Sequence, residues 1–199
     1  MTNTLKFIDL FAGCGGLSLG MEQAGFTPVY VNEINKDALS TYLINRREEF
    51  PYLEDSKFHS QDIKDCLDDK FFVKLKKNLR KQHGTSKIDL LCGGPPCQGF
   101  SGIGIRRSYS VDKKHLPSNH LFEDMARFIH KMQPKIFLFE NVQGLINARW
   151  KKNGEKGEIF EEVLATFKSL KGYTVKYKLV HSKDYGVPQN RPRILIIGI

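Results

Sequence analysis

Long apolar runs are absent from this sequence. Every apolar stretch is interrupted by charge, glycine or proline before it reaches the roughly 18 residues that a membrane helix needs. We also expect no secretory leader, because only residues 1–4 precede the first predicted strand and Asp9 lies inside that strand. We therefore expect a cytoplasmic protein with no membrane partner.

Cysteine is scarce, and its spacing carries no metal or disulfide signature. The four cysteines form no CxxC pair and no cysteine–histidine spacing of the kind that holds zinc. We expect no metal site, and free thiols in a reducing compartment. Two nucleotide-binding patterns are also missing, which argues against NAD and ATP. Ser18 stands where the third glycine of GxGxxG would be, and no GxxxxGK occurs.

The composition is that of a globular domain with a basic surface. The 199 residues are 40% hydrophobic and 11% aromatic, which is enough for one domain with a buried core. The net charge of +9 suggests a polyanionic partner, although a solvated basic face would give the same balance.

Short apolar runs alternate with segments of helical periodicity along the chain. We expect strands over 6–11, 29–32, 58–63, 88–92, 136–139, 175–180 and 194–198, and helices over 17–24, 36–45, 64–82, 121–132 and 158–170. Asn35 or Asp37 is expected to cap the second helix. This order predicts an α/β fold, a doubly wound, mostly parallel sheet with helices on both faces and one antiparallel strand near the C-terminus. Residues 99–119 are basic and without periodicity, so we expect a mobile active-site loop there.

Three features stand where predicted strands end, and in doubly wound sheets ligands collect at the carboxyl ends of strands. The glycine turn over 12–16 lets backbone approach a ligand closely. Glu33 lies twenty residues beyond Gly13, the separation at which an acidic side chain binds ribose hydroxyls. Asp62 is placed to accept from an adenine amino group. An adenosyl ligand without a phosphate chain, such as S-adenosylmethionine, suits this set, and a tight strand-to-helix connection without a ligand is the alternative.

Residues 89–101, DLLCGGPPCQGFS, place Cys97 behind two prolines at the end of an apolar run. A rigid turn after a strand aims the thiol out of the sheet, which predicts a nucleophile. A thiol with a pKa of about 8.5 is mostly protonated at neutral pH, so the thiolate needs nearby cations, and Arg191 and Arg193 are candidates. The remaining cysteines are expected to be buried as small hydrophobic residues: Cys14, Cys66 and Cys92.

Six sequence blocks resemble, in order, those of the cytosine-carbon-5 DNA methyltransferases: DLFAGCGGLSLG (9–20), VNEIN (31–35), QDI (61–63), GGPPCQGFS (93–101), FLFENVQGL (137–145) and QNRPR (189–193). The resemblance implies a Rossmann-like enzyme that uses S-adenosylmethionine. It also implies that the substrate is carbon 5 of a flipped-out cytosine in double-stranded DNA, methylated in a bacterial restriction-modification system.

The resemblance further implies roles for four catalytic residues. Cys97 would add to carbon 6 of cytosine, which makes carbon 5 the nucleophile that takes the methyl group. Glu140 would hold a proton at ring nitrogen 3, and Arg193 would contact the cytosine carbonyl oxygen. Arg191 would support the loop that holds Cys97. The loop over 99–119 would close over DNA phosphates with four cations, Arg106, Arg107, Lys113 and Lys114.

The family pattern also assigns the cofactor site. The residues around the methionine moiety would be Phe11, Gly13, Cys14, Gly15 and Gly16. Glu33 would bind the ribose, Ile34 would lie against adenine, and Asp62 and Ile63 would lie at the adenine edge. Pro96 and Leu121 would lie nearby.

Family members continue past residues 189–193 into a target-recognition region and a final helix, which these 199 residues do not contain. The resemblance therefore implies a catalytic and cofactor-binding domain over 1–199 that is incomplete at its C-terminal end. Such a chain is one subunit of a split enzyme, whose second polypeptide carries the target-recognition region, or an inactive remnant or binding subunit. A tRNA cytosine methyltransferase is a further alternative. Relatives of that kind carry Pro-Phe-Thr, whereas this sequence has Gly99-Phe100-Ser101.

Overall fold

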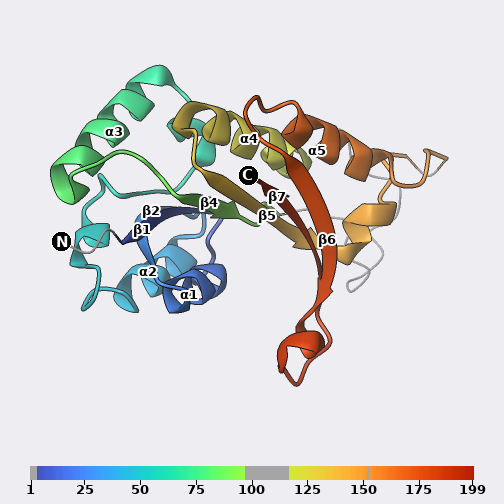
Figure 1. Ribbon diagram of the computed structural model, residues 1–199, viewed down its shortest axis with the longest axis horizontal. Helices are drawn as coiled ribbons and strands as arrows, with labels where there is room; N and C mark the ends of the chain where they lie inside the picture. Colours follow the sequence, from blue (N-terminus) through green and yellow to red (C-terminus); the bar gives the residue numbers. More distant parts are fainter. Residues whose placement is uncertain (1–3, 97–116, 152) are drawn as a thin grey trace. The chain divides into compact units, whose positions relative to one another are not determined.

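The computed structural model describes residues 4–96, 117–151 and 153–199 (Figure 1). The predicted nucleophile Cys97 and the predicted loop over 99–119 as far as residue 116 lie outside the described residues. The end of that predicted loop is described, and it forms part of a 3-10 helix, η4 (Pro117–His120).

Seven strands form one sheet in the order β3-β2-β1-β4-β5-β7-β6. Their bounds are β1 Leu5–Leu10, β2 Phe26–Asn32, β3 His59–Ser60, β4 Leu90–Gly93, β5 Ile136–Val142, β6 Val175–His181 and β7 Pro192–Gly198. β1 runs parallel to both β2 and β4, β2 runs parallel to β3, and β6 and β7 are antiparallel. The predicted mostly parallel sheet, with antiparallel pairing near the C-terminus, is therefore confirmed.

Five α-helices follow the strands: α1 Gly16–Gln23, α2 Lys36–Ile44, α3 Asp69–His83, α4 Leu121–Met132 and α5 Glu158–Lys168. Asn35 caps α2, as one of the two predicted alternatives had it, because its side chain accepts from the backbone N–H groups of Asp37 and Ala38. Among the described residues, no helix combines the length and the apolar character needed to cross a membrane.

The described residues fall into two compact units. The first unit comprises residues 4–94 and 127–137. Within it, α1 and α2 cover one face of β1 and β2, and α3 covers the other (Figure 1). On the α3 side, the ring of Tyr30 stacks on Phe128 with centroids 6.1 Å apart, and Phe72 meets Phe128 edge-on at 5.0 Å. β1 is buried from Lys6 to Leu10, so this strand forms the centre of the unit.

The second unit comprises the described residues of 95–126 and 138–199. The apolar face of α5 packs on the strands of this unit. The ring centroid of Phe167 lies 5.0 Å from that of Phe139 of β5, and the ring centroid of Phe160 lies 5.0 Å from that of Tyr177 of β6. The connection between β6 and β7 contains a 3-10 helix, η6 (Ser182–Tyr185), and projects from the end of this hairpin (Figure 1).

Several predicted boundaries were wrong. β3 is limited to two residues, and the helix predicted from residue 64 begins only at Asp69. Two side-chain caps explain the difference: Asp62 caps a short 3-10 helix, η2 (Ile63–Cys66), and Asp68 accepts from the backbone N–H of Phe71 to start α3. β5 and β7 are longer than predicted, which places Glu140 and Arg193 inside strands rather than in loops.

Candidate functional site

The turn between β1 and α1 takes an unusual backbone conformation. Three of its residues have left-handed φ angles: Phe11 at 59°, Gly13 at 56° and Gly15 at 90°. Phe11 is not a glycine, and a side chain makes this region costly. Such strain clusters at functional sites, because the surrounding structure must hold it in place.

The glycines of this turn serve different purposes. A Cβ built on Gly13 or Gly16 would meet nothing within 4 Å, so the turn is open on that side. A Cβ on Gly15 would lie 2.5 Å from the Arg46 Nη1 atom and 2.7 Å from the Tyr42 ring, so Gly15 is required for packing. The predicted cofactor turn is therefore open at Gly13 and Gly16 and tightly packed at Gly15.

Glu33 follows β2 and holds the glycine turn by a hydrogen bond. Its carboxylate accepts from the backbone N–H of Gly13 at 2.8 Å and from that of Asn35 at 2.8 Å. The residue is only 9% exposed. Each carboxylate oxygen can accept a second hydrogen bond, so Glu33 retains the capacity to bind ribose hydroxyls.

The other predicted adenosyl contacts of the first unit differ in accessibility. Ile34 is 68% exposed, although it is apolar, and is thus available to a ligand. Asp62 uses one oxygen to accept from the backbone N–H of Lys64 at 2.9 Å. Ile63 is buried, so its backbone rather than its side chain can reach a ligand. Cys14 is exposed, and the expectation that it is buried was wrong, because it lies in the turn where the chain leaves the sheet.

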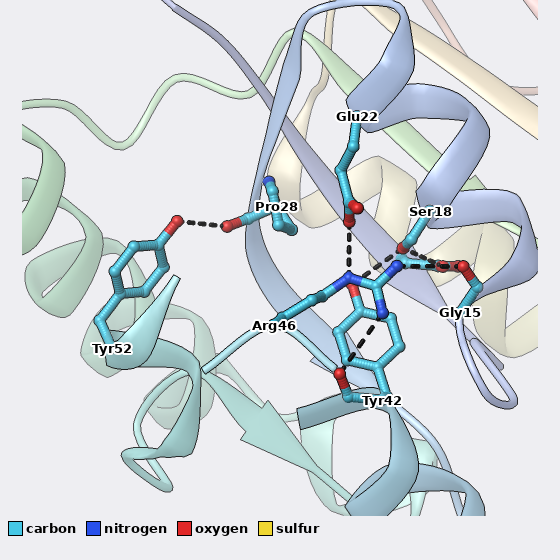
Figure 2. A network of polar contacts seen from close by, with 8 residues as sticks. Gly15, Ser18, Glu22, Pro28, Tyr42, Arg46 and Tyr52 are labelled. Atoms are coloured by element: carbon cyan, nitrogen blue, oxygen red, sulfur yellow. Dashed lines mark hydrogen bonds and ion pairs between the residues drawn. The ribbon is translucent and has the colours of Figure 1, made fainter. Parts of the chain in front are cut away.

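Ser18, at the position of the missing third glycine, belongs to a buried network behind the turn (Figure 2). Its hydroxyl donates to Asp9 Oδ2 at 2.6 Å and lies 2.8 Å from the Tyr42 hydroxyl. Burial raises the pKa of the Asp9 carboxyl to about 7, although the Ser18 hydrogen bond lowers it. This network was not predicted, because its members lie on β1, α1 and α2 and no local sequence pattern connects them.

Two of the predicted catalytic residues meet in the second unit. Arg193 of β7 pairs with Glu140 of β5, with the Nε and Oε1 atoms 2.6 Å apart. Their side chains are 18% and 29% exposed, so the pair is sheltered and still reachable. The carboxylate and the guanidinium satisfy one another, which lets both polar side chains stand within strands.

Asn141, next to Glu140, positions the segment that leads to the predicted nucleophile. This residue is buried, and its Nδ2 atom donates to the Pro95 carbonyl oxygen at 3.0 Å. Its Oδ1 atom accepts from the backbone N–H of Val142 at 2.9 Å. No role was predicted for Asn141. The sequence does carry an indication of one, because an amide within an apolar strand needs a hydrogen-bonding partner when it is buried.

The remaining predicted residues of the second unit lie at its surface or its edge. Arg191 is exposed, and its backbone N–H donates to the Ser182 Oγ atom at 2.9 Å, which closes the β6–β7 connection. Pro96 is exposed, and Leu121, the first residue of α4, is half-buried. Across the described residues, no cluster of three or more histidine, cysteine, aspartate or glutamate side chains could hold a metal ion.

The profile of the C-5 cytosine-specific DNA methylase family matches residues 5–199. The Type II methyltransferase M1.HphI of Haemophilus parahaemolyticus is 39% identical over 98% of this chain and 46% of that protein. M.BsuFI of Bacillus subtilis is 36% identical over 98% of this chain and 39% of its own length. A crystal structure described as a DNA modification methyltransferase encoded within an E. coli prophage matches with a TM-score of 0.69 and 30% identity, over 98% of this chain and 47% of that one. The chain thus spans about half or less of the length of these relatives.

Proposed function

Because the chain belongs to the C-5 cytosine-specific DNA methylase family, we propose that it transfers a methyl group from S-adenosylmethionine to carbon 5 of cytosine in double-stranded DNA. The Type II methyltransferases among its relatives favour the methylation step of a restriction-modification system. The observation that carries the proposal is the Glu140–Arg193 pair, with 2.6 Å between Nε and Oε1. A carboxyl and a guanidinium side by side match two adjacent positions of cytosine, ring nitrogen 3 and the carbonyl oxygen.

The pair is suited to receive a flipped base. Before the base arrives, each charge compensates the other, so neither is buried unpaired. With cytosine bound, Arg193 would donate to the carbonyl oxygen and Glu140 would hold a proton at nitrogen 3. The proton neutralises the negative charge that nucleophilic addition delivers to the ring. The base must leave the DNA stack to reach these groups, as it does for other DNA methyltransferases.

Cys97 would be the nucleophile, and Asn141 would position it by fixing the Pro95 carbonyl two residues earlier. The thiolate would form a bond to carbon 6, and the electron pair of the 5,6 double bond would pass to carbon 5. Carbon 5 would then form the new bond to the methyl carbon while the bond between that carbon and the donor sulfur breaks, which leaves its electron pair on sulfur. A solvent base then removes the proton from carbon 5. Expulsion of the thiolate restores the double bond and frees Cys97.

The first unit fits an adenosyl cofactor, which would supply an electrophilic methyl group on sulfur. Gly13 and Gly16 leave open space beside the turn, and the Glu33 carboxylate lies beside Gly13. Ile34 offers an exposed apolar surface for adenine. We expect the ribose hydroxyls to donate to Glu33 and the adenine ring to lie on Ile34.

Cys97→Ala tests the proposed chemistry. Tritiated methyl transfer to DNA should fall to background, while the calorimetric affinity for S-adenosylmethionine stays within twofold of that of the unsubstituted chain. Cys66→Ser is the matched control, because it removes a buried thiol of η2 and keeps a hydrogen-bonding atom there. Retained transfer by Cys97→Ala would refute the covalent mechanism.

We also propose that the choice of cytosine depends on residues outside these 199, since the relatives extend well beyond the matched part. Base-edge contacts carry sequence specificity, and the proposed site contains contacts to the flipped base alone. The chain should be assayed on DNA and on tRNA, with and without the products of neighbouring reading frames. Transfer to DNA that requires a second polypeptide supports a split enzyme. Transfer to tRNA alone would replace DNA as the substrate, and an absence of transfer in every arm would indicate a binding subunit.

A further inference from the structure

A buried ion pair lies beside the glycine turn, in contact with Gly15. Arg46, just beyond the end of α2, pairs with Glu22 of α1, with 2.6 Å between Nε and Oε1 (Figure 2). The side chains are 6% and 15% exposed. None of the family-like sequence blocks includes Arg46, so the pair is a feature of this chain that its motifs do not explain.

The guanidinium of Arg46 ties three elements together. Its Nη2 atom donates to the Gly15 carbonyl oxygen at 3.1 Å, and its Nη1 atom donates to the Tyr42 carbonyl oxygen at 3.4 Å. The charged group also lies 3.9 Å from the centroid of the Tyr42 ring. One planar cation therefore connects the turn, the end of α2 and, through Glu22, helix α1.

Stability alone is a poor explanation for this arrangement. Replacing a buried ion pair by packed apolar side chains is often neutral, or stabilising by about 1–4 kcal/mol, because desolvation opposes the attraction between the charges. The guanidinium does provide a geometric constraint. Gly15 has a φ of 90°, and its α-carbon lies so close to Arg46 that an added Cβ would be 2.5 Å from Nη1. The conformation of Gly15 and the position of Arg46 thus depend on one another.

The turn is held between opposite charges. The Glu33 carboxylate accepts from the Gly13 N–H, and the Arg46 guanidinium donates to the Gly15 carbonyl oxygen. We propose that Arg46 is a positioning residue for the cofactor, which keeps the turn from Gly13 to Gly16 in the conformation that leaves its open side free. This inference rests on the proposed use of S-adenosylmethionine.

Arg46→Lys is the most informative variant. Lysine keeps a positive charge near Glu22, but its single ammonium cannot reproduce the planar fork that reaches Gly15, Tyr42 and Glu22 together. We expect the dissociation constant for S-adenosylmethionine, measured calorimetrically on the full chain, to rise about tenfold. Glu22→Gln, which keeps a neutral acceptor for Arg46, should give a smaller rise.

Arg47→Met is the matched control. Arg47 is the next residue in the chain, but it is exposed and pairs with Glu54 at 3.1 Å, away from the turn. The affinity of the Arg47→Met variant for the cofactor should equal that of the unsubstituted chain. Urea unfolding of every variant separates the two roles, because a purely structural residue lowers the free energy of unfolding without changing the affinity of the folded protein.

The possible outcomes are distinct. A rise in the dissociation constant for Arg46→Lys, with none for Arg47→Met, supports the inference. An affinity for Arg46→Lys within twofold of the unsubstituted chain overturns it and leaves the proposed function standing. Failure of the unsubstituted chain to bind S-adenosylmethionine would refute the proposed cofactor, and the inference with it.

Discussion

Asp9 should make the protein less stable as the pH rises towards neutrality. The residue lies on β1 with 1% exposure, and its Oδ2 atom accepts from Ser18 at 2.6 Å. Its Oδ1 atom has no hydrogen-bond partner among the described residues. Burial raises the pKa of this carboxyl from 3.8 to about 7, and this effect outweighs the hydrogen bond from Ser18 and the positive charge of Arg46, which both lower the pKa.

The sign follows from proton binding. The folded state holds the proton of Asp9 more tightly than the unfolded state does, so the contribution to stability is full below pH 3.8 and is lost as the pH rises to about 7. Each pH unit in that window lowers the free energy of unfolding by about 1.4 kcal/mol. The whole loss is about 4 kcal/mol, which is large compared with the free energy of unfolding of a typical domain, about 5–15 kcal/mol.

His83 acts in the opposite direction over part of the same window. Burial lowers its pKa from 6.5 to about 4, so its contribution is lost as the pH falls through that range. The pH profile of the unsubstituted protein therefore combines two opposing slopes. Tyr42 and Cys92, which neighbour Asp9, stay neutral throughout, because burial raises the pKa of both.

Asp9→Asn isolates the effect of the carboxyl. Free energies of unfolding in urea, measured from pH 4 to pH 8 for both proteins, should diverge with rising pH, in favour of the asparagine variant, by about 4 kcal/mol. Asp55→Asn is the control, because hydrogen bonds from Lys57 lower the pKa of this exposed carboxyl below 3.8, so the difference between this variant and the unsubstituted protein should stay nearly flat from pH 4 to pH 8. A difference between Asp9→Asn and the unsubstituted protein that is flat, or that falls with pH, would refute the assignment.

Four further predictions concern the proposed cofactor contacts and the residue that positions the proposed nucleophile. Glu33→Gln should raise the dissociation constant for S-adenosylmethionine at least tenfold, because an amide replaces one carboxylate acceptor; an unchanged calorimetric affinity would exclude the ribose contact. Gly15→Ala should lower the free energy of unfolding by about 2–4 kcal/mol through backbone strain and overlap with Arg46. Gly16→Ala should change it by less than about 1 kcal/mol and weaken cofactor binding instead. Asn141→Ala should slow tritiated methyl transfer at least tenfold with unchanged cofactor affinity, because the Pro95 carbonyl loses its partner.

The elements that the sequence predicted well are those whose signals are local. Hydrophobic periodicity and a following proline delimit α4, which spans Leu121–Met132 as predicted. Asn35 caps α2 through bonds to residues two and three positions away. The mostly parallel sheet followed from the alternation of strands and helices, because parallel strands need crossover connections.

The boundary of β5 was predicted wrongly because it depends on a partner far along the chain. The apolar run of β5 stops at Phe139, yet the strand continues to Val142 because the charge of Glu140 is met by Arg193 of β7. A prediction from hydrophobic periodicity ends the strand at the first polar residue, Glu140, which is too early. The position of Glu33 beside the glycine turn was predicted from a spacing rule. The positions of Arg46 and Tyr42 could not be predicted in this way, because only the fold brings them to the turn. The predicted ligands of Glu33 and its neighbours stay predictions.

The replacement of the third glycine by Ser18 now has a physical reason. In dinucleotide-binding turns, that glycine lets the helix approach the strand closely. Here Ser18 is fully buried at the same place, and its hydroxyl bridges Asp9 of β1 and Tyr42 of α2. The helix is thus fixed to the strand by hydrogen bonds rather than by close backbone contact. With Arg46 behind Gly15 and Glu33 beside Gly13, the turn is held in its open conformation by side chains of the protein itself, so an adenosyl ligand need not supply the energy to shape it.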